Sequence, residues 1–225
     1  MKRKLLLLLG IIALSFAAYW VVEMYYFADG VKKDAVRLEQ HRLTSSIQNG
    51  DIIFHTSKSA QSKAIQLATH SKYSHVGIIY EKGGNYYVYE AVQPVKLTPL
   101  NQWINRGDKG HYVIKRLKNA DEILTPDVLR KMKTLGEKYK GKNYDIYFEW
   151  SDDRIYCSEL VWKIYREATG IEIGQLESLS DFDLSSNAVK EKMKERYGNA
   201  IPMDEKVISP AAMFKSNKLT TVKEN

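Results

Sequence analysis

The sequence almost lacks cysteine, because its 225 residues include only Cys157. A single thiol leaves no partner for an intramolecular disulfide, so the disulfide-stapled scaffolds of small secreted proteins are excluded. With five prolines and 13 glycines, the chain also lacks the composition of a collagen-like or proline-rich polymer. It has no His-Glu-x-x-His spacing, and we expect no metal site and no cofactor.

Zinc-finger, helix-turn-helix and RNA-binding signatures are absent as well, although the formal charge is +7. The lysines are spread along the chain rather than gathered in one stripe. We therefore interpret the charge as a solvated basic surface and expect no nucleic-acid partner. The length fits one domain with appendages.

Charge is missing from one long stretch, the apolar run from Leu5 to Val22, which follows the basic head Met1 to Lys4. Residues 1–22 therefore predict either a cleaved signal peptide, with small residues at Ser15 and Ala17, or an uncleaved membrane anchor. Either a signal peptide or an anchor predicts an exported protein of the periplasm or cell envelope. In the case of an anchor, residues 5–22 hold the protein in the inner membrane. Residues 23–47 are expected to form a linker or helix, and residues 48–225 the functional domain.

Hydrophobic periodicity predicts an α+β domain with an antiparallel sheet. Alternation and turn signals predict strands, and 3.6-residue spacing predicts helices. The expected strands are 51–54, 75–80, 86–91, 111–117 and 219–222, and the expected helices are 59–69, 126–139, 157–169 and 188–196.

Cys157 is expected at the first residue of the 157–169 helix. Backbone N–H groups and the helix dipole stabilise a thiolate there by about 0.3 to 1 kcal/mol. Because one pKa unit corresponds to about 1.4 kcal/mol, the dipole alone shifts the thiol pKa by less than one unit. A reactive thiol therefore needs a cationic imidazole beside it.

The hairpin between the two central strands selects His75 from the five histidines. If its loop is the four residues Glu81 to Gly84, Tyr80 pairs with Asn85 and His75 lies directly opposite Glu90. Directly opposed residues have Cβ atoms about 4.5 to 5.5 Å apart. Glu90 can then orient one imidazole nitrogen of His75 while the other nitrogen faces the thiol.

Several motifs together resemble a known family. They are Asn49 to Phe54, Tyr73 to Ile79, Tyr89-Glu90-Ala91, Tyr144-Asp145, Tyr156 to Leu160 and Ile208 to Ala212. They look like the circularly permuted branch of the NlpC-type papain-like cysteine hydrolases, the YiiX/YaeF-like (YebB-like) group. The resemblance covers about residues 48–222.

This resemblance implies a permuted papain-like fold in which an antiparallel sheet packs against the helix that carries the nucleophile. It implies Cys157 as nucleophile, His75 as general base and Glu90 as the orienting residue of a cysteine peptidase or amidase. Related lecithin retinol acyltransferase-like proteins bring acyl chains into consideration.

Three further residues are candidates for substrate contact or for the second oxyanion donor: Tyr73, Tyr156 and Ser158. Packing is the alternative for the tyrosines, and a helix-start role is the alternative for Ser158. The expected substrate is a peptidoglycan stem peptide. The first alternative is that the substrate is an acylated or lipid amide or ester, which the enzyme hydrolyses or whose acyl group it transfers. The second alternative is that the domain is a non-catalytic binding module of the cell envelope.

Overall fold

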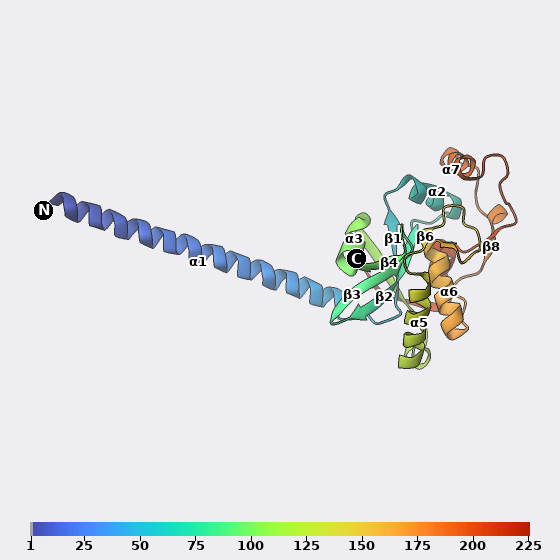
Figure 1. Ribbon diagram of the computed structural model, residues 1–225, viewed down its shortest axis with the longest axis horizontal. Helices are drawn as coiled ribbons and strands as arrows, with labels where there is room; N and C mark the ends of the chain where they lie inside the picture. Colours follow the sequence, from blue (N-terminus) through green and yellow to red (C-terminus); the bar gives the residue numbers. More distant parts are fainter. Residues whose placement is uncertain (1) are drawn as a thin grey trace. The chain divides into compact units, whose positions relative to one another are not determined.

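The computed structural model describes residues 2–225, without the side chains of residues 2–15, 17 and 39–43. It divides into two compact units, residues 1–45 and 46–225. The first contains one helix, α1 (Lys2–Thr44), which joins the predicted apolar segment and the predicted linker in a single element (Figure 1). The side chains of residues 5–15 and 17, which make up most of the predicted membrane segment, lie outside the described part of the structure. Over the residues that were described, no helix is long and apolar enough to cross a membrane.

The second unit is built on a six-stranded antiparallel sheet in the order β10-β5-β1-β2-β3-β4. The strands are β1 (Ile52–Ser57), β2 (His75–Lys82), β3 (Asn85–Glu90), β4 (Lys96–Pro99), β5 (Gly107–Leu117) and β10 (Leu219–Glu224). Each of the five predicted strands is present. β4 was not predicted, because its four residues are too short for alternation to be evident.

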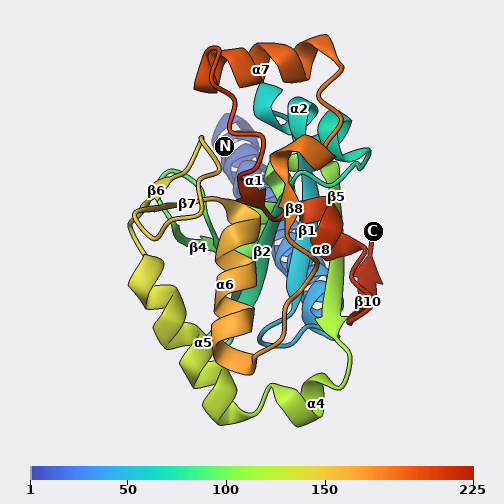
Figure 2. The same ribbon diagram turned by 90° about the vertical axis from the view of Figure 1, so that its right-hand side faces the viewer.

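Helices cover the sheet as the predicted α+β class requires. They are α2 (Ala60–Thr69), α3 (Leu100–Arg106), α4 (Ala120–Ile123), α5 (Pro126–Tyr139), α6 (Cys157–Thr169), α7 (Asn187–Tyr197) and α8 (Pro210–Phe214). Figure 2 shows α5 and α6 in front of the sheet, with α2 and α7 together at one end. Short segments complete the unit: β6 (Asn143–Tyr144), β7 (Arg154–Ile155), β8 (Glu177–Ser178), η1 (Leu179–Asp181) and β9 (Lys206–Val207).

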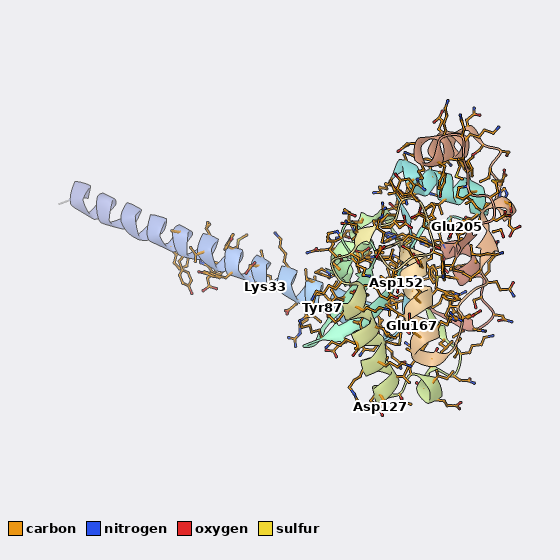
Figure 3. The ribbon with its side chains drawn as sticks, turned by 45° about the vertical axis from the view of Figure 1, so that its right-hand side comes forward. Lys33, Tyr87, Asp127, Asp152, Glu167 and Glu205 are labelled. Carbon is orange, nitrogen blue, oxygen red and sulfur yellow. The ribbon has the colours of Figure 1, made fainter. Side chains whose placement is uncertain are left out.

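The core lies between α6 and the sheet. Leu160, Val161 and Ile164 of α6 are fully buried in one cluster with Ile52 and Val76 of the central strands. Burying such side chains contributes about 1.5 to 3 kcal/mol each, so α6 is fixed firmly on the sheet. Charged side chains such as Asp127 and Glu167 lie on the outside (Figure 3).

Candidate active site

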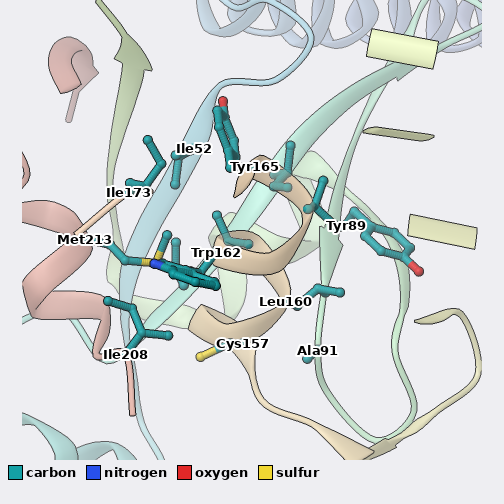
Figure 4. Packing of buried hydrophobic residues seen from close by; sticks show 14 of the residues in the cluster. Ile52, Tyr89, Ala91, Cys157, Leu160, Trp162, Tyr165, Ile173, Ile208 and Met213 are labelled. Carbon is teal, nitrogen blue, oxygen red and sulfur yellow. The ribbon is translucent and has the colours of Figure 1, made fainter. Parts of the chain in front are cut away.

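Cys157 is the first residue of α6, as predicted, and only 2% of it is exposed. The helix begins here because Tyr156 has an extended backbone and its N–H donates to the Glu159 carboxylate at 3.4 Å. It ends at Gly170, whose φ of 76° favours glycine. Figure 4 shows the sulfur at the end of α6, beside Ile208. The N–H of Cys157 lies in the first turn, where no intrahelical acceptor exists.

His75 and Glu90 lie at neighbouring ends of β2 and β3. The His75 Nε2 and Glu90 Oε2 atoms are 2.6 Å apart, and Glu90 is fully buried. Because Glu90 engages Nε2, the Nδ1 atom of the ring remains for the thiol, with which His75 shares a hydrogen bond. The three predicted residues are therefore brought together in the order Cys157, His75, Glu90.

The predicted four-residue hairpin loop is wrong. Lys82 pairs with Asn85, which leaves a two-residue turn. Gly83 and Gly84 have φ angles of 60° and 76°, and two positive φ angles in succession suit the tight hairpin turn that follows the strand twist.

This turn shifts the register by two residues, so His75 is not directly opposite Glu90. Extending the observed pairing of Ile78 with Tyr89 places Glu90 opposite Gly77. A shift of two preserves the face of each side chain, and His75 becomes the diagonal neighbour of Glu90. Diagonal positions remain within reach of long side chains, which is why the contact forms although the predicted register is wrong.

Three residues that the sequence analysis missed surround Glu90. Thr98 Oγ1 donates to it at 2.5 Å, Trp103 Nε1 at 2.9 Å and the Arg106 guanidinium at 2.5 Å. They come from β4 and α3, elements too short for periodicity to predict. Burial would raise the pKa of Glu90, but the hydrogen bonds and charges of His75, Arg106 and Thr98 lower it to about 2.

The thiol and the imidazole stabilise each other's charged forms. Burial would raise the pKa of Cys157, but the charge and hydrogen bond of His75 and the backbone N–H groups of Val76 and Ser158 lower it. Burial would likewise lower the pKa of His75, but the charge of Cys157 and the hydrogen bond to Glu90 raise it to about 9. The thiolate and the imidazolium therefore each make the other more favourable.

A second histidine, His55, lies beside the first. Its ring stacks on Trp103 with centroids 3.9 Å apart and is 5.2 Å from the His75 ring. Burial, followed by the charges of His75 and Arg106, lowers its pKa to about 2. His55 is therefore neutral and packs against His75 without competing for its proton.

Tyr144 is another residue that the sequence analysis did not select, although the Tyr144-Asp145 motif was recognised. Its hydroxyl accepts a hydrogen bond from Gln61 Nε2 at 3.0 Å and also interacts with Cys157. Burial and the neighbouring thiolate raise its pKa well above the usual value, so the phenol stays protonated. Tyr144 thus presents an O–H donor beside the sulfur.

The three candidates for substrate contact or oxyanion donation, Tyr73, Tyr156 and Ser158, lie in different places. Tyr73 packs between Phe54 and Phe214 and lines neither cavity beside Cys157. Tyr156 and Ser158 line one of them, but both also fix Ile208: its N–H donates to the Tyr156 hydroxyl at 3.1 Å, and its carbonyl accepts from Ser158 Oγ at 2.7 Å.

Two cavities meet at the catalytic candidates. One is a groove of about 480 Å³, called the polar groove because most of its lining residues are polar, among them His75, Ser57, Ser74 and Arg106, although apolar atoms make up the larger part of its exposed surface. The other is a narrower, apolar cavity of about 90 Å³ that Cys157 lines together with side chains of α2 and α7. Access to the site is therefore of mixed polarity on the imidazole side and almost wholly apolar on the sulfur side.

A thiol at a helix start that faces a histidine and a carboxylate on an antiparallel sheet defines the papain-like cysteine hydrolases as a class. Within that class, residues 46–223 match the model of the permuted papain-like amidase enzymes, YaeF/YiiX, C92 family. The chain belongs to this family.

Two relatives from Escherichia coli support the assignment. The uncharacterized protein YiiX of strain K12 is 52% identical over 175 residues, which cover 78% of this chain and 85% of the relative. A crystal structure described as that of metalloprotein yiiX from strain O157:H7, DUF1105, has a TM-score of 0.76 and 50% identity, and the match covers 80% of this chain and 98% of that one.

The description of that relative as a metalloprotein raises the question of whether a metal fits this site. Within the described part of the chain, no group of three or more His, Cys, Asp or Glu side chains is placed to hold one. Both Glu90 oxygens and His75 Nε2 are already engaged, which leaves the sulfur of Cys157 and Nδ1 of His75. Two ligand atoms do not make a protein metal site of the usual kind, and no step of the chemistry below involves a metal.

Proposed function

We propose that this protein hydrolyses amide or ester bonds by covalent catalysis through a Cys157-His75-Glu90 triad. The observation that carries the proposal is the continuous buried line from the thiol through His75 to Glu90, with the 2.6 Å contact between the last two. Membership of a permuted papain-like amidase family supports the same reaction class.

The proposed mechanism has two halves. The Cys157 thiolate attacks the carbonyl carbon, and Nδ1 of His75 gives its proton to the leaving amine or alcohol as the bond to carbon breaks. Water then attacks the thioester while His75 takes its proton, which releases the acid and restores the thiolate. Glu90 stays ionised throughout and keeps the ring oriented.

The developing oxyanion needs hydrogen-bond donors beside the sulfur. We assign this role to the backbone N–H of Cys157 and to the hydroxyl of Tyr144, whose oxygen accepts from Gln61 and whose proton is shared with the Cys157 sulfur. Donors placed in advance where charge develops are among the largest contributions to catalysis.

The location proposed for this reaction is the cell envelope. The basic head and the apolar run from Leu5 to Val22 support export. The exposed aromatic residues Tyr19, Trp20 and Tyr25 of α1 are of the kind that lies at membrane interfaces.

The proposal is tested by labelling the full chain with iodoacetamide at neutral pH. We expect Cys157 to react faster than a free thiol, and His75→Ala to remove this advantage. The control is His70→Asn, because His70 is exposed with a φ of 49°, which Asn tolerates. If Cys157 reacts no faster than a free thiol and His75→Ala changes nothing, the protein is a binding module rather than an enzyme.

A further inference from the structure

The two cavities divide the substrate between them. Cys157 lines the apolar cavity but not the polar groove, whereas His75 lines the polar groove but not the apolar cavity. Gln61, Ile65 and Tyr144 line both. A substrate held across these three residues therefore extends from the reacting carbonyl in two directions, one almost wholly apolar and one that offers many polar side chains.

The different roles of Cys157 and His75 in the reaction determine which part of the substrate lies in which cavity. The acyl carbon becomes bonded to the sulfur, so the acyl part extends from the Cys157 side. The leaving group receives its proton from His75, so it lies on the His75 side. The acyl part therefore enters the apolar cavity, and the leaving group remains in the polar groove.

The walls of the apolar cavity suit a hydrocarbon chain. Ala64 and Ala68 of α2 face Val189 and Met193 of α7, and further apolar lining comes from residues 179–184, from residues 207–210 and from aromatic residues near Cys157. A peptide in this space would bury N–H and C=O groups without partners, at a cost of roughly 1 to 3 kcal/mol for each group. A methylene chain needs no partners and gains from burial.

Two cations lie on this wall. Lys192 pairs with Glu195 at 2.5 Å. The Arg196 guanidinium lies 4.7 Å from the centre of the Phe148 ring, which is itself part of the lining, so this charge stays beside the cavity. The aliphatic stems of both side chains extend the apolar wall, and almost all of the surface exposed in the cavity is apolar, which suits an uncharged chain.

We propose that the substrate is an amide or ester of a fatty acyl chain, with the unbranched chain in the α2–α7 cavity and a polar leaving group in the groove beside His75. This rests on the proposed function, because it assumes acyl transfer to Cys157. It selects the acylated class over the peptidoglycan stem peptide.

The test measures acylation of the full chain by p-nitrophenyl acetate, butyrate, hexanoate and octanoate, followed as a burst of p-nitrophenol. We expect the second-order acylation rate constant to rise about fourfold for each added CH₂ until the cavity is filled, since one buried CH₂ contributes about 0.8 kcal/mol. In a second series of alkyl acetates, where the chain is in the leaving group, we expect no such rise.

Ala68→Phe places a ring in the apolar cavity and should abolish the gain from longer chains, so that the four esters acylate Cys157 at similar rates. Val92→Phe adds similar bulk to the polar groove and should keep the dependence on acyl length, whatever its effect on the absolute rate. Leu184→Ala enlarges the apolar cavity and should extend the rise to longer chains, which provides a second test should Ala68→Phe fail to fold.

The outcomes separate the two proposals. If Cys157 is acylated equally fast by all four esters, or if the stem peptide is hydrolysed faster than every acyl substrate, the acyl-chain proposal is overturned and the thiol hydrolase remains. If no ester gives a burst beyond that of Cys157→Ala, the proposed function itself fails.

Discussion

Glu90 is a single charge buried away from water and held by donors from three elements. Removing a charge of this kind from water costs several kcal/mol unless it is paired and fully hydrogen-bonded. His75, Thr98, Trp103 and Arg106 together meet that requirement. The result is a fixed negative charge that holds the imidazole in one orientation and favours its protonated form.

This arrangement predicts the pH dependence of hydrolysis. The raised His75 pKa of about 9 means that the ring keeps its proton up to that pH, and the lowered Cys157 pKa means that the thiolate persists below the usual thiol range. We expect kcat/KM to fall above about pH 9, as His75 loses the proton needed by the leaving group.

The same pKa shift has a consequence for stability. Because the folded-state pKa of His75 exceeds its usual value, its contribution to stability is complete below about pH 6.5 and is lost as the pH rises through about 9.

Glu90→Gln removes one cause of the raised His75 pKa and should move the alkaline limb of kcat/KM to lower pH. An alkaline limb that does not move would exclude His75 as its origin.

Tyr144→Phe tests the proposed oxyanion donor. The substitution removes the hydroxyl beside the sulfur but keeps the ring that lines both cavities, so kcat should fall by about 10²-fold with little change in KM. The matched control is Tyr197→Phe, because the Tyr197 hydroxyl donates to the Tyr147 carbonyl instead. Steady-state hydrolysis of p-nitrophenyl butyrate measures both, and an equal effect of the two substitutions would contradict the assignment.

At the scale of elements, the β2–β3 hairpin positions the site. The Gly83–Gly84 turn fixes the register, and Gly77 allows the strands to approach beside the triad. A Cβ on Gly77 would lie 2.4 Å from Val88 Cγ1 and 2.8 Å from the Tyr89 carbonyl oxygen. Glycine is required here by space, because no positive φ is involved.

Gly77→Ala should therefore destabilise the protein by about 1 to 3 kcal/mol through overpacking, and it should slow alkylation of Cys157 by shifting His75 relative to Glu90. Urea unfolding and the alkylation rate measure the two effects. Gly30→Ala is the control, since nothing lies within 4 Å of that Cβ and alanine favours a helix. A Gly77→Ala protein as stable as wild type would contradict the close approach.

At the scale of the whole molecule, the chain consists of two units, residues 1–45 and 46–225, and we propose that the first directs where the second works. An arginine near the centre of an inserted apolar segment costs about 2.5 to 3.5 kcal/mol. Leu14→Arg should therefore prevent export of the domain, whether residues 1–22 act as a cleaved signal or as an anchor.

Protease accessibility of the domain in cells with a permeabilised outer envelope measures export, and the size of the exported product distinguishes cleavage from anchoring. Leu38→Arg is the matched control, because Leu38 lies beyond the apolar run and is 71% exposed. Equal export of Leu14→Arg and wild type would refute the role of the segment.

The sequence by itself determined much of this protein. Period-two and period-3.6 patterns predicted the long strands and helices, including the bounds of α5 and α6, because these segments are long enough for burial to shape their composition. The motifs around His75, Glu90 and Cys157 identified the family and the residues that the fold brings together.

Only the tertiary structure showed what surrounds the hairpin. Its two-residue turn is signalled locally by the Gly83-Gly84 pair, whose φ angles are both positive, and the expected four-residue loop passed over that signal. Trp103, Arg106 and Tyr144 come from short segments without periodicity, and nothing in their order along the chain shows that they meet near Cys157 and Glu90. The apolar and polar cavities likewise form from elements distant in sequence, so the distribution of polarity around the sulfur exists only once the chain has folded.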